Sequence, residues 1–140
     1  MQDPARRRLL WHGALFLLIA LCYGVVTAVA SHGRAWMAAH MTGLLAAVLV
    51  IAIGLVWNDL RLAEGQRRSL FRLLLAGMYA GFTASTFGAI VDLPGPATRP
   101  GETGPAWQQL IFYALLLVIV PSLLSASALL LHGLRGREGS

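Results

Sequence analysis

Four long apolar stretches, separated by short polar segments, dominate the chain. They cover residues 9–30, 38–57, 69–91 and 107–132. Each has about the 20 residues that a helix needs to cross the hydrocarbon core of a bilayer. The stretches are apolar at successive positions, whereas the strands of a membrane barrel alternate between apolar and polar residues. The pattern predicts a single domain of 140 residues, an all-α membrane protein built as a four-transmembrane-helix bundle.

Composition supports this assignment. Hydrophobic residues make up 57% of the chain and charged residues 12%, about half the charge of a typical soluble domain. The net charge of +5 does not indicate a nucleic-acid partner, because the basic residues form short clusters between apolar stretches and no basic face. The stretch over residues 9–30 is longer than the apolar region of ~7–15 residues in a signal peptide, so we expect a retained helix.

Arginine placement predicts the orientation in the membrane. All 11 basic residues are arginines. Only Arg34 and Arg99 lie on the outer side if the N-terminus is inside. The inner side then holds Arg6, Arg7, Arg8, Arg61, Arg67, Arg68, Arg72, Arg135 and Arg137. This bias predicts that both termini are cytoplasmic, in the inner or cell membrane. On the outer side, residues 92–106 hold four prolines and predict a lid or a folded patch.

Histidines are the first candidates for chemistry. His12 and His132 lie near the predicted inner face, and His32 and His40 near the outer face, where each is most simply an interfacial side chain. His40 differs because it begins a face of small residues, which lets a helix approach another helix or a flat ligand closely. That face holds Gly43, Ala46, Ala47 and Gly54. A neutral imidazole is a common ligand of haem iron. One axial histidine leaves a position open for substrate, whereas a pair such as His12 and His132 would favour electron transfer.

Hydroxyl groups on the third stretch are the second candidates. Tyr79 and Thr83 are four residues apart and share a helix face, so we expect them to orient a substrate. The alternative is that such hydroxyls satisfy neighbouring backbone carbonyls. The sequence has no arrangement typical of a hydrolase, and no charged group near mid-membrane of the kind that coupled transporters use.

Two segments resemble small membrane enzymes. Residues 8–13 read RLLWHG, and residues 39–62 read AHMTGLLAAVLVIAIGLVWNDLRL. They resemble the four-helix hydroxylaminobenzene mutases and, more distantly, the styrene oxide isomerases, whose Ala-His pair supplies the axial ligand of haem b. The resemblance implies that His40 binds iron, that Gly43 and Ala47 lie against non-covalent haem b, and that the chain forms a homotrimer. Ala46 and Ala76 replace an Asn and an Asp of the isomerases.

The resemblance implies a haem-dependent membrane isomerase or mutase acting on a small apolar aromatic substrate. The leading reaction is rearrangement of an arylhydroxylamine to an aminophenol, and the alternative is isomerisation of an aryl epoxide to an aldehyde. Two other classes stay open on the residues alone. One is a b-type electron-transfer subunit with His12 and His132 as ligands, and the other is a haem-free membrane scaffold or small transporter subunit.

Overall fold

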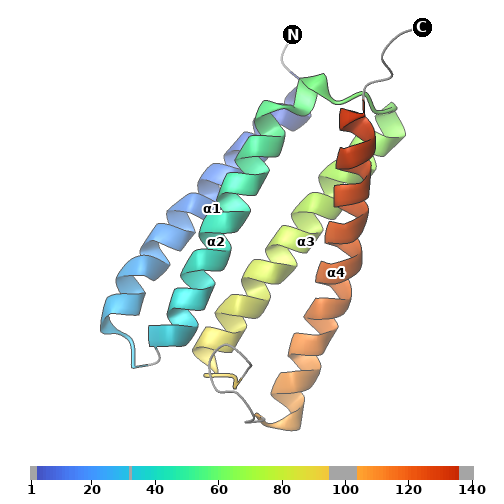
Figure 1. The fold of residues 1–140 in the computed structure, drawn as a ribbon. Helices are drawn as coiled ribbons and strands as arrows, with labels where there is room; N and C mark the ends of the chain where they lie inside the picture. The colour runs from blue at the N-terminus through green and yellow to red at the C-terminus, as the bar shows by residue number, and fades with distance from the viewer. Residues whose placement is uncertain (1–2, 32, 95–103, 136–140) are drawn as a thin grey trace, which may run out of the picture.

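The computed structural model describes residues 3–31, 33–94 and 104–135. It contains four long helices, α1 (Pro4–Val29), α2 (Gly33–Leu55), α3 (Glu64–Ile90) and α4 (Ala106–Leu134), and a short 3-10 helix, η1 (Trp57–Asp59) (Figure 1). All four long helices have the length and apolar composition to cross a membrane. The predicted all-α membrane bundle is confirmed. Most of the predicted lid over residues 92–106 lies outside the described residues.

The helices are longer than the apolar stretches that predicted them. α1, α2 and α3 begin at Pro4, Gly33 and Glu64, ahead of the predicted starts at residues 9, 38 and 69. Hydropathy marks the part of a helix that matches the hydrocarbon core, whereas the hydrogen-bonded backbone continues into the polar headgroup region. The extra turns carry arginines, among them Arg8 and Arg68.

The helices form a row of two antiparallel hairpins (Figure 1). α1 packs on α2, α3 packs on α4, and α2 contacts α3 between them. Gly43 lies at the crossing of three helices, because a Cβ there would be 2.8 Å from both the Ala20 Cβ and the Phe82 Cε2. The small-residue face of α2 therefore permits close packing of α2 against its two neighbours.

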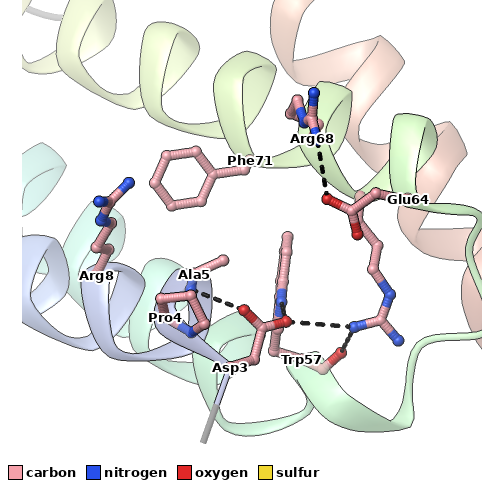
Figure 2. Close-up of a pocket in the computed structure, with 9 residues that line it drawn as sticks. Asp3, Pro4, Ala5, Arg8, Trp57, Glu64, Arg68 and Phe71 are labelled. Atoms are coloured by element: carbon pink, nitrogen blue, oxygen red, sulfur yellow. Dashed lines mark hydrogen bonds and ion pairs between the residues drawn. The ribbon is translucent and has the colours of Figure 1, made fainter.

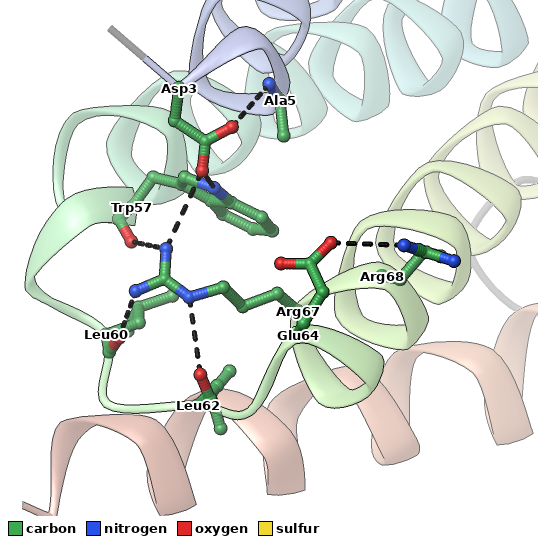
Figure 3. Close-up of polar contacts among 8 residues, drawn as sticks. All are labelled: Asp3, Ala5, Trp57, Leu60, Leu62, Glu64, Arg67 and Arg68. Atoms are coloured by element: carbon green, nitrogen blue, oxygen red, sulfur yellow. Dashed lines mark hydrogen bonds and ion pairs between the residues drawn. The ribbon is translucent and has the colours of Figure 1, made fainter. Parts of the chain in front are cut away.

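Hydrogen bonds from Arg67 hold the connection between α2 and α3 in place. Its guanidinium donates hydrogen bonds to the carbonyl oxygens of Leu60 (2.6 Å), Trp57 (3.3 Å) and Leu62 (3.4 Å), and its Nη1 lies 3.7 Å from Asp3 Oδ2 (Figure 3). Asp3 also caps α1 by accepting from the Ala5 N–H at 2.8 Å, and it accepts from Trp57 Nε1 at 2.9 Å. We call Asp3, Trp57 and Arg67 the Arg67 clasp. It joins α1, η1 and α3 at the end of the bundle that holds both termini (Figure 1).

At the opposite end, α3 stops at a left-handed residue. Asp92 has φ 48°, and the Leu93 N–H donates to the Gly88 carbonyl at 2.9 Å. This is the hydrogen bond of a Schellman cap, in which an aspartate is tolerated because its side chain is short and polar.

Candidate functional site

His40 lies in the contact between α2 and α1. Its Nδ1 is 2.7 Å from the backbone carbonyl oxygen of Ala20. Gly24 lies one turn further along α1, and a Cβ at this position would be 3.1 Å from His40 Cε1. The imidazole therefore fits in a space that α1 leaves because residue 24 has no side chain.

The hydrogen bond to Ala20 sets the tautomer of the neutral ring. A carbonyl oxygen only accepts, so Nδ1 of His40 carries the proton, and Nε2 of the neutral ring keeps its lone pair. No residue in the described part of the chain hydrogen-bonds to Nε2. Metal-binding histidines commonly donate their other ring N–H to a backbone carbonyl in this way. His40 is half-buried, and its predicted role as an iron ligand stays a prediction.

Apolar side chains surround this position. Met37 precedes His40 by three residues on α2 and is 47% exposed, and Leu21 precedes Gly24 by three residues on α1 and is 54% exposed. Residues three apart lie on one helix face, so Met37 shares a face of α2 with His40, and Leu21 shares a face of α1 with Gly24. An apolar surface around one nitrogen ligand suits a flat macrocycle such as haem. Among the described residues, no group of three His, Cys, Asp or Glu side chains gathers to hold a bare metal ion.

A belt of hydroxyl groups lies at the depth of His40. The Tyr23 hydroxyl is 3.3 Å from Thr86 Oγ1, and Ser85 donates to Thr42 Oγ1 at 3.1 Å. Tyr23 precedes Gly24 on α1, and Thr42 follows His40 by two residues on α2. Thr86 also donates to the Phe82 carbonyl at 2.8 Å. The hydroxyls of α3 therefore satisfy a carbonyl, as one sequence interpretation held, and also link α3 to both other helices.

Tyr79 forms a separate polar contact. Its hydroxyl is 2.8 Å from His12 Nδ1, and its ring lies 4.6 Å from the ring of Phe16. These α1 contacts precede those of His40 by about eight residues, which is about 12 Å along a helix. Tyr79 therefore does not share a site with His40 within one chain. Its predicted role in orienting substrate stays a prediction.

The other predicted site residues occupy different surroundings. Thr83 is exposed on α3. Gly43 and Ala47 are buried against protein: Gly43 faces Ala20 and Phe82, and the Ala47 carbonyl lies beside Gly13. Their predicted contact with a cofactor stays a prediction.

His12 and His132, the alternative pair of haem ligands, do not lie together within one chain. His12 contacts Tyr79 on α3, whereas the side chain of His132 is exposed on α4. α1 and α4 share no extended interface in the described structure. One chain therefore does not place these two imidazoles on opposite faces of one iron.

Sequence reasoning missed three participants of the His40 site. The carbonyl of Ala20 carries no side-chain signal at all. Gly24 and Tyr23 lie on α1, and only the pairing of α1 with α2 brings them to His40. A Gly within an apolar stretch was the available signal, because small residues mark close helix contacts in membranes.

Taken together, these features define a polytopic helical membrane protein in which the backbone of α1 holds the imidazole of one histidine of α2. The chain belongs to the family described as styrene oxide isomerase, whose sequence model matches residues 5–135. It is also similar to the hydroxylaminobenzene mutase HabB of Ectopseudomonas oleovorans, with 31% identity over 135 residues, covering 94% of this chain and 82% of the relative. No solved structure matches the chain.

These relationships confirm the family resemblance and the assignment to the isomerase class of enzymes. They also support the coarser functional prediction, an isomerase or mutase of aromatic compounds. The family description and the name of the relative refer to different kinds of substrate, so the family alone does not identify the reaction.

Proposed function

We propose that this protein is a haem-dependent membrane isomerase that rearranges a small aromatic substrate, with the conversion of an arylhydroxylamine to an aminophenol as its leading reaction. The observation that carries the haem assignment is the hydrogen bond between His40 and Ala20, which leaves Nε2 of the imidazole with a lone pair. The similarity to HabB along 94% of the chain supports the choice of substrate.

His40 would hold the iron through Nε2. Bound haem b would supply a ferric Lewis acid for the substrate heteroatom, in a rearrangement that needs no net oxidation or reduction. The Ala20 carbonyl keeps the imidazole in one tautomer and increases its electron donation to a metal. The apolar flank of Met37 and Leu21 keeps water away, and charge–dipole interactions are stronger in such a dry site. In the net reaction, the N–O bond breaks and a bond from oxygen to a ring carbon forms. That carbon loses its proton and the nitrogen gains one, so substrate and product are isomers.

A second candidate is the isomerisation of an aryl epoxide to an aldehyde. The family model that matches residues 5–135 carries the styrene oxide description, and this match favours the candidate. Here the benzylic C–O bond breaks, and a 1,2-shift of hydrogen gives the carbonyl product. In this chain, Ala46 and Ala76 replace an Asn and an Asp of the styrene oxide isomerases. The loss of these polar residues favours the arylhydroxylamine reaction.

We place the protein in the cell membrane with both termini in the cytoplasm, on the basis of the arginine distribution. We further propose an assembly of three copies, as the resemblance implies. A single row of four helices leaves wide apolar faces uncovered. In the apolar segment of α4, for example, only 11% of the residues are buried. An apolar substrate reaches such a site from the lipid, in which it is concentrated.

The test is an absorption spectrum of the purified full chain in detergent, as isolated and after addition of hemin. We expect a ferric Soret band that responds to added small ligands and is lost in His40→Ala. His132→Ala is the matched control, because its side chain is exposed on α4 and it should keep the band. Added imidazole should restore haem binding to His40→Ala, since it replaces the missing ligand.

Turnover then separates the two reactions. The haem-loaded protein is assayed with an arylhydroxylamine and with an aryl epoxide, and isomeric products are quantified by chromatography. A His40→Ala protein that retains both haem and activity would refute the ligand assignment. A protein that binds no hemin would refute the haem proposal.

A further inference from the structure

A cavity of about 220 Å³ lies at the end of the bundle where α1 and α3 begin. It lies between the first turns of α1 and α3, and Figure 2 shows its lining. Phe71 and Trp57 form apolar walls, and Arg8, Arg68, Asp3 and Glu64 bring charge to its rim. It lies on the opposite side of the Tyr79–His12 contact from His40, so it is distinct from the proposed iron site.

The charges around this cavity are not balanced. Three arginines and two carboxylates line it, which leaves a net charge of +1. Arg67 is engaged in the Arg67 clasp, with a side chain only 23% exposed. Arg68 pairs with Glu64 at 3.3 Å, but both side chains are exposed, at 64% and 77%, and such an ion pair is weak. Arg8 has no ion pair or hydrogen bond within the described chain. Two guanidinium groups are thus available to an anion.

Arg8 and Arg68 stand on either side of Phe71 (Figure 2). Each directly precedes an apolar stretch, residues 9–30 for Arg8 and residues 69–91 for Arg68. Both side chains therefore start at the boundary between hydrocarbon and headgroups, where the phosphates of the bilayer lie.

We propose that this cavity binds the phosphate group of an anionic phospholipid. Arg8 and Arg68 hold the phosphate oxygens, since a guanidinium forms paired, charge-assisted hydrogen bonds to phosphate. The acyl chains follow the apolar surfaces of α1 and α3 into the bilayer. The lipid bridges the two helix hairpins beside the Arg67 clasp, where Arg67 of α3 faces Asp3 at the start of α1.

Free phosphate and a lipid headgroup share this chemistry, but depth favours the lipid. A site at the headgroup level meets a high local concentration of lipid phosphate, and the net positive charge favours an anionic lipid over a zwitterionic one. The inference does not depend on the proposed iron site or on the reaction.

Native mass spectrometry of the full chain in detergent tests the proposal. Phosphatidylglycerol or phosphatidylcholine is added in equal amounts, and the bound lipid is quantified for each variant. We expect preferential retention of phosphatidylglycerol, and roughly tenfold weaker retention in Arg8→Gln and in Arg68→Gln, as for loss of a charge-assisted hydrogen bond. Arg7→Gln is the matched control, because Arg7 is an exposed neighbour that does not line the cavity.

Three results would overturn the proposal. Equal retention of the two lipids would show that charge plays no part. An equal loss in Arg7→Gln would indicate general attraction by the arginine-rich end. Displacement of phosphatidylglycerol by an equimolar amount of inorganic phosphate would identify a free anion as the ligand. Because the readout is lipid mass, these outcomes are independent of haem binding and of activity.

Discussion

The imidazole Nδ1 of His40 and the carbonyl oxygen of Ala20 lie 2.7 Å apart and join α2 to α1. The carbonyl of a helix residue is normally used by the N–H four residues later, so it accepts a second bond here through its other lone pair. The contact does two things. It sets the orientation of the imidazole, and it links the position of His40 to the backbone of α1. Because the acceptor is a backbone oxygen, a substitution of the Ala20 side chain does not remove it.

Gly24→Ala is expected to disturb the imidazole. The new Cβ would lie 3.1 Å from His40 Cε1, so the ring or α1 must shift. We expect a loss of about 1 kcal/mol in haem binding, roughly fivefold in affinity, and an altered Soret band. The measurement is hemin titration in detergent. Gly65→Ala is the control, because nothing lies within 4 Å of its Cβ and both variants gain the same helix propensity. Identical titrations for the two variants would contradict the geometry.

Gly43→Ala is expected to destabilise the bundle. Its Cβ would meet the Ala20 Cβ and the Phe82 Cε2 at 2.8 Å each, and overpacking of this kind costs about 1–3 kcal/mol. Thermal unfolding in detergent, followed by circular dichroism, measures the loss. Gly81→Ala serves as the control on α3, where a Cβ meets nothing within 4 Å. A variant as stable as this control would show that α1 and α3 do not press on Gly43.

His12 and Tyr79 are expected to be energetically coupled. Their hydrogen bond of 2.8 Å lies between α1 and α3 inside the bundle. Tyr79→Phe, His12→Leu and the double variant form a cycle, and we expect a coupling energy of about 1 kcal/mol in unfolding free energy. Additive single effects would mean that the bond contributes nothing. Turnover of the same variants tests the predicted substrate role, since a purely structural Tyr79 lowers stability and leaves kcat unchanged.

Arg67→Ala and Arg68→Ala are expected to differ strongly in stability. Arg67 donates to three carbonyls and faces Asp3, so its loss leaves several acceptors unpaired and costs about 2–3 kcal/mol. Arg68 forms one exposed ion pair with Glu64, worth about 0.3–0.5 kcal/mol. Arg67→Lys should not restore stability, because one ammonium group cannot span three separate carbonyls. Chemical or thermal unfolding of the variants ranks them.

Most of the fold was predictable because a bilayer allows few solutions. Continuous apolar stretches of membrane-spanning length leave helices as the default, and the four spans followed directly. The helix starts were missed by one turn or more because arginine-rich first turns such as that of α3 remain helical outside the hydrocarbon core. Asp3 and Trp57 drew no expectation of a joint role, because residues 54 positions apart meet only through tertiary packing.

The candidate site was predictable only in part. His40 was singled out by its small-residue face and by resemblance, and its role as a ligand stays a prediction. The partners of His40 were not predictable, since a backbone carbonyl leaves no mark on the sequence. Tyr79 and Thr83 share a helix face by spacing, but spacing does not fix their depth relative to His40. The contact of Tyr79 with His12 shows that depth along a neighbouring helix decides which side chains meet.

The Arg67 clasp also sets an order of events during biosynthesis. Asp3 directly precedes α1, and its partner Arg67 in α3 is synthesised only after the whole of α1 and α2 has been made. The first hairpin must therefore reside in the membrane with an open amino-terminal end until the start of α3 emerges. The clasp then forms when the second hairpin arrives, so that the residue capping α1 is held by a residue in the first turn of α3.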